Sequence, residues 1–311
     1  MPLHPSAQAL VDMLGESGLG ITPETTPESA RRAMEAATGM IPKHEIFSVE
    51  DRTLPGPAGA VPVRVYRPSA GTALPVVMWI HGGGWVTGSL ETHDQLCRQL
   101  ADDTSAIVVS VDYRLAPEAK FPSAVDDCVA AWRWISEHAS ELGGDPARIA
   151  IAGDSAGGNL AAVTALVARE ERLALPLVQL LVYPVTDHEL DSASMIDNAK
   201  GYFLEAEGMR WFYDHYARTP ADYDDWRYSP IRAADLSGLP AAIVLTAEFD
   251  PLRDQGEAYA LRLQEAGTPT QASRADGLFH GFFGMHPFLP PAREPWEIAV
   301  AGLRAAFGTT R

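Results

Sequence analysis

Cysteine is scarce in this chain of 311 residues, which contains only Cys97 and Cys128. Two cysteines cannot build the dense disulfide framework that stabilises small secreted domains. Both lie in segments with a helical pattern. We therefore expect two buried thiols, and a single disulfide between them is the alternative.

Basic residues and long apolar runs are also in short supply. Lysine and arginine number 24 against 41 aspartates and glutamates, so the formal net charge is −17. A surplus of negative charge repels nucleic acids and anionic membrane surfaces. No apolar run approaches the roughly 18 residues that a membrane-spanning helix needs, and residues 1–7 lack the basic and apolar regions of a signal peptide. We therefore expect a soluble cytoplasmic protein with no nucleic-acid partner and no membrane insertion.

The remaining composition is that of a folded protein with a large core. Apolar residues make up 46% and charged residues 21% of the chain, values typical of globular domains. Short apolar runs alternate with amphipathic helical patterns, which favours an α/β fold with a mostly parallel, doubly wound central sheet. The expected strands cover residues 61–66, 75–80, 106–112, 149–152, 177–183, 241–247 and 270–274, and the expected helices cover residues 123–138, 159–169, 205–216, 255–265 and 295–307.

Two segments depart from this alternation. Residues 1–42 have a helical pattern, in which Thr26-Pro27-Glu28 provides a cap, a first-position proline and a first-turn acid. Residues 185–230 form an insertion rich in tyrosine, phenylalanine and tryptophan. We expect both segments to form a helical cap on a catalytic domain of residues 43–311. A helical subdomain packed for stability is the alternative, and the two roles are compatible.

Gly153, Ser155 and Gly157 form a G-x-S-x-G sequence between an apolar strand pattern and a helical pattern. In this arrangement a sharp turn with small neighbours exposes the serine hydroxyl at the end of a strand. Ser155 is therefore our candidate nucleophile. A chance match in a chain with 26 glycines is the alternative, which the placement between strand and helix disfavours. Because a serine hydroxyl is weakly nucleophilic at neutral pH, Ser155 needs a base, an acid and oxyanion donors elsewhere.

Ser155, Asp250 and His280 each follow an expected strand. Functional groups of doubly wound sheets gather at the carboxyl ends of the strands, and serine, acid, histidine is the chain order of α/β-hydrolase triads. His280 is the expected general base, and Asp250 would orient its ring and stabilise the imidazolium. A solvent-exposed loop histidine is the alternative for His280. For Asp250 the alternative is a helix cap before Pro251, and Asp254, farther from the strand end, is a second candidate for the acid.

His81, Gly82, Gly83 and Gly84 directly follow an apolar strand pattern. Adjacent glycines allow backbone conformations that other residues avoid and let main-chain N–H groups approach a ligand closely. An HGGG sequence is the partner of this type of serine turn in lipases and esterases. We expect the N–H groups of Gly83, Gly84 and Ala156 to stabilise an oxyanion. A flexible turn is the alternative for the glycine run.

Together these motifs resemble the bacterial hormone-sensitive-lipase family of carboxylesterases, over about residues 60–305. The resemblance rests on HGGGW at 81–85, YRLAPE at 113–118, GDSAGG at 153–158, DPLRD at 250–254 and HGF at 280–282. The resemblance implies that five further motif residues support the site: His81, Gly82, Gly153, Asp154 and Gly157. It also places the chain in the GDSAG rather than the GTSAG branch of the family. It implies an α/β-hydrolase fold with a helical cap, hydrolysis of small-molecule esters with short to medium acyl chains, no cofactor or metal, and often a homodimer.

Other functions fit the sequence less well. Non-catalytic receptors that resemble this family typically lose the triad histidine, whereas His280 is present. A metallohydrolase is disfavoured because the chain has no H-E-x-x-H sequence and its histidines lack ligand spacing. An amidase or deacetylase with the same triad stays open, since the preference for a leaving group depends on pocket shape.

Overall fold

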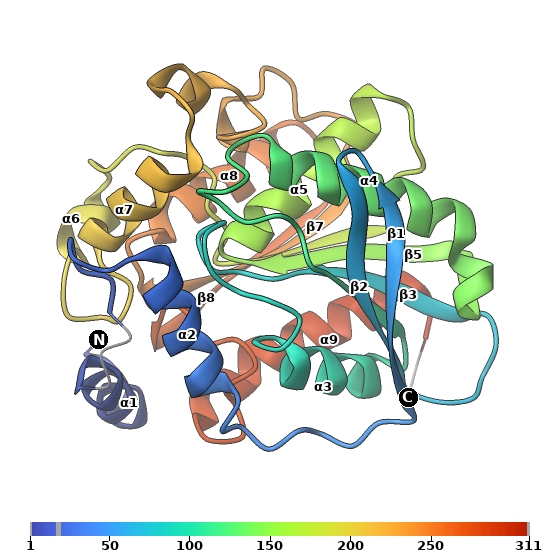
Figure 1. The fold of residues 1–311 in the computed structure, drawn as a ribbon, viewed down its shortest axis with the longest axis horizontal. Coiled ribbons are helices and arrows are strands. Elements are labelled where there is room, and N and C mark those ends of the chain that lie inside the picture. The colour runs from blue at the N-terminus through green and yellow to red at the C-terminus, as the bar shows by residue number, and fades with distance from the viewer. Residues whose placement is uncertain (1, 17–19, 310–311) are drawn as a thin grey trace.

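A computed structural model describes residues 2–16 and 20–309, which are built around a single eight-stranded sheet (Figure 1). The strand order is β1-β2-β4-β3-β5-β6-β7-β8. β1 and β2 form an antiparallel hairpin that joins β4 antiparallel, and the pairs from β4 to β8 are parallel. The strands are β1 Ser48–Gly56, β2 Gly59–Arg67, β3 Leu74–Ile80, β4 Ile107–Val111, β5 Gly144–Asp154, β6 Val178–Val182, β7 Ala241–Phe249 and β8 Thr270–Phe279. The predicted mostly parallel, doubly wound sheet is confirmed.

Helices cover both faces of the sheet. α4 (Ser123–His138), α5 (Ala156–Glu170) and α8 (Arg253–Glu265) lie on one face, and α3 (Asp94–Thr104) and α9 (Arg293–Phe307) lie on the other (Figure 1). Successive side chains of a strand point to opposite faces. Accordingly, Met78 belongs to the core under α4 and α5, whereas Trp79 belongs to the core under α3 and α9. Burial on both faces explains why the central strands are continuously apolar.

The two cysteines lie in these two separate cores. Cys97 is in α3 and Cys128 is in α4, and both are buried free thiols. The sheet stands between them, because Cys97 packs in one core and Cys128 in the other. The predicted buried thiols are therefore confirmed, and the alternative disulfide is wrong.

The structure contains one strand, β1, that the sequence did not predict. β1 is an edge strand paired only with β2, and Leu54 is its one fully buried side chain. An edge strand is held by its backbone and buries few side chains, so its hydrophobic pattern is weak. β8 also continues to Phe279, beyond the expected end at residue 274.

The N-terminal helices and the inserted segment lie beside each other at one end of the sheet (Figure 1). These elements are α1 (Pro5–Glu16), α2 (Pro27–Thr38), α6 (Ala193–Asp197) and α7 (Ala206–Tyr216). The short turns η2 (Pro220–Asp224) and η3 (Pro230–Arg232) follow α7, and η3 packs against α5 and α8; η1 (Ala139–Leu142) and η4 (Pro290–Ala292) lie elsewhere. α2 starts as predicted, with Thr26 as the cap and Pro27 at the first position. The indole of Trp211 in α7 donates a hydrogen bond of 3.1 Å to the carbonyl of Thr25. Among residues 2–16 and 20–309, no helix is long and apolar enough to cross a membrane.

Candidate active site

Ser155 lies at a tight turn between the end of β5 and the start of α5. Its backbone has φ 55° and ψ −118°, in a region that a residue with a side chain rarely occupies and that costs roughly 1–3 kcal/mol. The N–H of Ser155 donates to the carbonyl of Val182 at 2.8 Å, and the carbonyl of Ser155 accepts from Val185 at 3.2 Å. These bonds to the end of the neighbouring strand β6 hold the strained turn in place.

The two flanking glycines make this turn possible. A Cβ on Gly153 would collide with the backbone of Gly157, and a Cβ on Gly157 would collide with the carbonyl oxygens of Ile80 and His81. Helix α5 therefore crosses the end of β3 at a distance that only glycine permits. The small residues of the G-x-S-x-G sequence are thus explained by backbone contact.

His280 and Asp250 reach Ser155 from the ends of two other strands. His280 Nε2 lies 3.0 Å from Ser155 Oγ, and His280 Nδ1 lies 2.7 Å from Asp250 Oδ2. Asp250 is completely buried, and its second oxygen accepts the N–H of Leu252 at 2.8 Å. His280 and Ser155 are only 7% and 8% exposed, so His280 is not a solvent-exposed loop residue. The three side chains form one continuous hydrogen-bonded chain.

Asp254 takes no part in this chain. Its Oδ2 accepts the N–H of Ser194 at 2.7 Å, and its Oδ1 pairs with Arg253 at 2.9 Å. Burial raises the pKa of the Asp254 carboxyl, but the bonds from Ser194 and Arg253 outweigh burial and hold the pKa below its ordinary value. Asp254 therefore anchors the start of α6, at Ser194, to α8.

The glycine run after β3 is held by hydrogen bonds that leave some of its N–H groups free. Gly83 and Gly84 have φ values of +114° and +58°. The carbonyl of Gly83 accepts the N–H groups of Val86 at 3.1 Å and Thr87 at 2.8 Å. The N–H groups of Gly83, Gly84 and Ala156 donate no hydrogen bond to any residue that the structure describes. Three donors are therefore available near the serine turn.

Asp154 and His81 attach this loop to the rest of the site. The N–H of Gly82 donates to Asp154 Oδ1 at 3.0 Å, and the hydroxyl of Tyr113 donates to the carbonyl of His81 at 3.0 Å. The His81 ring is fully buried and stacks on Tyr113. Burial, with the charge of His93 acting in the same direction, lowers the pKa of His81 to about 3. A neutral, enclosed His81 therefore supports the loop and does not face the cavity.

A cavity of about 780 Å³ opens in front of Ser155 and His280. Gly83 and Gly84 line it too, so two of the three residues with free N–H groups border the same space as the serine. Most of its other walls are apolar and come from α1, α2, the residues just before α2 and the inserted segment: Val11, Leu14, Ile21, Ala30, Met34, Phe203, Leu204, Met209 and Phe212. The cavity therefore suits a small, largely apolar ligand.

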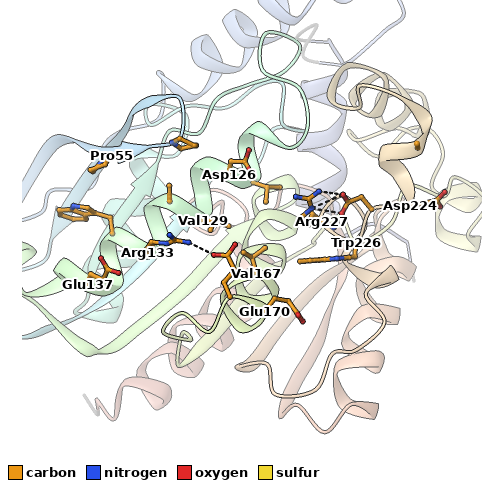
Figure 2. Close-up of a pocket in the computed structure, with 17 residues that line it drawn as sticks. Pro55, Asp126, Val129, Arg133, Glu137, Val167, Glu170, Asp224, Trp226 and Arg227 are labelled. Carbon is orange, nitrogen blue, oxygen red and sulfur yellow. Dashed lines mark hydrogen bonds and ion pairs between the residues drawn. The ribbon is translucent and has the colours of Figure 1, made fainter.

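A larger groove of about 1180 Å³ lies elsewhere on the molecule, between α4, the end of α5 and the η2 region (Figure 2). No serine, histidine or cysteine lines it, and Arg133 and Arg227 in its wall are paired with Glu171 and Asp225. The larger space thus lacks a serine or cysteine nucleophile. Nor do residues 2–16 and 20–309 contain a group of three or more side chains arranged to hold a metal ion.

The chain is similar to known proteins over most of its length. Residues 77–284 match the family model described as the alpha/beta hydrolase fold. The chain is 42% identical to the carboxylic ester hydrolase LipN of Mycobacterium tuberculosis, over 97% of this chain and 83% of that protein. It is 40% identical to an ethyl acetate hydrolase of Pseudomonas putida, over 98% of this chain and 99% of that protein. The solved structure of a hyperthermophilic esterase from Pyrobaculum calidifontis superposes with a TM-score of 0.94 at 43% identity, covering 98% and 99% of the two chains.

The chain belongs to the hormone-sensitive-lipase family of carboxylesterases. It is a carboxylic ester hydrolase with the α/β-hydrolase fold, as its motifs predict.

Sequence reasoning missed two side chains beside the active-site cavity of this esterase. Tyr183, at the end of β6, lines the cavity, and its ring centroid lies 4.5 Å from that of His280. His93, before α3, lies 3.2 Å from Asp154. Neither residue is part of a catalytic motif. The one sequence signal for His93 is its position shortly after the glycine run.

Proposed function

We propose that this carboxylesterase hydrolyses its substrates through an acyl-enzyme intermediate on Ser155, with His280 as general acid and base and Asp250 as the orienting carboxylate. The hydrogen-bonded chain of Asp250, His280 and Ser155, with separations of 2.7 and 3.0 Å, is the observation that carries the proposal. The acceptor Asp250 requires a proton on His280 Nδ1, which leaves Nε2 free to accept the serine proton.

The reaction then proceeds in two halves. Ser155 Oγ attacks the carbonyl carbon of the ester while its proton moves to His280 Nε2. When the bond from that carbon to the alkoxy oxygen breaks, His280 returns the proton to the leaving alcohol. A water molecule next gives a proton to His280 and attacks the acyl carbon. The bond from that carbon to Ser155 Oγ breaks and His280 returns the proton to Oγ, which releases the carboxylic acid and restores Ser155.

The N–H groups of Gly83, Gly84 and Ala156 would stabilise the negative charge on the carbonyl oxygen in each half. Their freedom from other hydrogen-bond partners among the described residues supports this role. Donors that are already oriented lose no free energy to reorganisation during the reaction, and each contributes about 2.7–4 kcal/mol of barrier lowering in related sites.

Short to medium acyl chains, with a maximum at about four to eight carbons, suit the volume and apolar walls of the cavity. In this proposal the N-terminal helices and residues 185–230 act as a cap that bounds chain length. The ethyl acetate hydrolase among the relatives is consistent with a small ester. The homodimer and the cytoplasmic location stay predictions.

A panel of p-nitrophenyl esters of increasing chain length, with an anilide added, tests this function on the wild type and on Ser155→Ala. We expect rapid hydrolysis of short esters by the wild type and none by the variant, with near-UV circular dichroism unchanged. More than a few per cent residual activity in purified Ser155→Ala would contradict the proposed nucleophile. Faster cleavage of the anilide than of the matching ester would indicate an amidase.

A further inference from the structure

A second buried histidine and aspartate lie next to the nucleophile, in addition to His280 and Asp250. His93 is 6% exposed and Asp154 is 8% exposed. His93 Nε2 lies 3.2 Å from Asp154 Oδ1, the same oxygen that accepts the N–H of Gly82 at 3.0 Å. His93 is thus connected to the glycine loop through one carboxylate.

The other side of the ring contacts a hydroxyl. Thr92 Oγ1 lies 2.9 Å from the carbonyl oxygen of Ser89 and 2.9 Å from His93 Nδ1. The single hydroxyl proton can go to only one of these two atoms, and when it goes to Ser89, Nδ1 donates to Thr92. Nε2 faces the carboxylate of Asp154, which can only accept. The surroundings of His93 therefore accommodate a proton on each ring nitrogen.

The negative charge of Asp154 lies close to the position of the oxyanion. This residue directly precedes Ser155 and lines the same cavity as Gly83 and Gly84. A bare carboxylate there would repel the negative charge that develops on the substrate oxygen. Burial raises the pKa of the Asp154 carboxyl, but the charge of His93 and the bonds from His93 and Gly82 outweigh it and lower the pKa. Asp154 is therefore ionised, and the His93 ring is in contact with its carboxylate.

We propose that His93 is a positioning residue of this esterase, which neutralises Asp154 and orients its carboxylate so that Asp154 holds Gly82 and keeps the N–H groups of Gly83 and Gly84 aimed at the oxyanion. The inference rests on the proposed function of Ser155 and the glycine loop. His93 does not line the cavity, so it acts through Asp154 and not on the substrate. Its effect belongs to the transition state, where the oxyanion forms, and not to substrate binding.

Steady-state kinetics of His93→Gln on p-nitrophenyl butyrate tests the proposal. Glutamine can still donate to Asp154 but carries no charge, so kcat should fall by about tenfold or more while KM changes by less than about twofold. The inhibition constant of a simple alkylboronic acid, which forms a tetrahedral anion on the serine, should rise by the factor that kcat/KM loses. His138→Gln is the matched control, because His138 at the end of α4 stacks on Trp134 and does not line the cavity.

The double variant His93→Gln/Asp154→Asn separates charge compensation from simple packing. The amide oxygen of asparagine can still accept the N–H of Gly82, and no bare negative charge remains. We expect kcat of the double variant to exceed that of His93→Gln, since the repulsion is gone. A packing role for His93 predicts no recovery, and that result would overturn the proposal.

Other outcomes are equally informative. A folded His93→Gln enzyme with wild-type kcat, or with only a raised KM, contradicts this inference and leaves Ser155 as the nucleophile. If His93→Gln does not fold, Asp154→Asn alone provides the test. It keeps an acceptor for the N–H of Gly82 and removes the negative charge, so it should lose less kcat than Asp154→Ala, which removes the acceptor as well. A loss as complete as that of Ser155→Ala would show that the charge of Asp154 is itself required and would overturn the proposal.

Discussion

Arg31 in α2 and Glu118 in the loop after β4 form a two-point ion pair, with N–O separations of 2.8 and 2.7 Å. The same guanidinium donates to the carbonyl oxygens of Val86 and Ala116, each at 2.8 Å. Through Arg31, α2 is attached to the segment that follows the glycine loop. Since Ala30 of α2 lines the cavity, this ion pair also holds one of the cavity walls.

Arg31→Gln should therefore destabilise the fold by about 1–2 kcal/mol, a modest value because Glu118 is largely exposed. Thermal unfolding should show a melting temperature lower by a few degrees. Arg32→Gln is the control, because the pair of Arg32 with Glu28 is exposed on both sides and should contribute little. Equal effects of the two substitutions would contradict the attachment of α2 through Arg31.

The contribution of this pair should depend on pH in a defined direction. The hydrogen bond from Arg31 lowers the pKa of Glu118 from 4.5 to about 2. A carboxyl whose pKa is lower in the folded state stabilises the fold above its unfolded pKa and loses that contribution as the pH falls through the folded pKa. The difference in unfolding free energy between the wild type and Arg31→Gln should therefore be constant above about pH 5 and shrink towards pH 2. A difference that grows on acidification would refute this assignment.

The two candidate acids should separate clearly in kinetics. Asp250→Asn should lower kcat by several orders of magnitude, about 10⁴-fold in comparable triads, because the amide favours the wrong tautomer of His280 and does not support its cation. Asp254→Asn should be much milder, since that carboxylate bonds to Ser194 and Arg253. Measurement of kcat for both variants on one short-chain ester decides between them, and the reverse ranking would make Asp254 the catalytic acid.

The wall formed by α2 should influence chain length. Met34 lines the cavity, so Met34→Trp should reduce its volume and lower kcat/KM for octanoate more than for acetate. Met13→Trp is the matched control, because Met13 is 59% exposed and does not line the cavity. Tributyrin and trioleate should also differ strongly in the wild type. Equal rates on both, or a Met34→Trp profile that matches the wild type, would argue against a cap that bounds chain length.

Gly157 should tolerate no side chain. A Cβ there would collide with the carbonyl oxygens of Ile80 and His81, so Gly157→Ala must displace α5 from β3 and should cost about 3 kcal/mol or more. Gly15→Ala is the control, because nothing lies within 4 Å of its Cβ position. Thermal melts of both variants measure the difference. A stable, fully active Gly157→Ala enzyme would refute the close crossing as the reason for this glycine.

The sequence by itself determined the central sheet, most of the helices and the family. Buried strands such as β3 and β4 are continuously apolar, and α4 repeats its apolar residues at helical spacing, so local patterns are strong there. The turn at Ser155 and the glycines after β3 also show in sequence, because each needs glycine at defined positions. β1 was not predicted, because an exposed edge strand has almost no hydrophobic pattern.

The tertiary structure alone decided which side chains meet. Asp250 and Asp254 are four residues apart in the chain. Only the packing of α6 against α8 shows that the Asp254 carboxylate accepts a hydrogen bond from Ser194. The link from His93 through Asp154 to Gly82 joins residues up to 72 positions apart. Hydrogen bonds of this kind act over about 3 Å in space and leave no periodic trace along the chain. For that reason the residue types of a site can be read from sequence, whereas their partners are set only when the strands align.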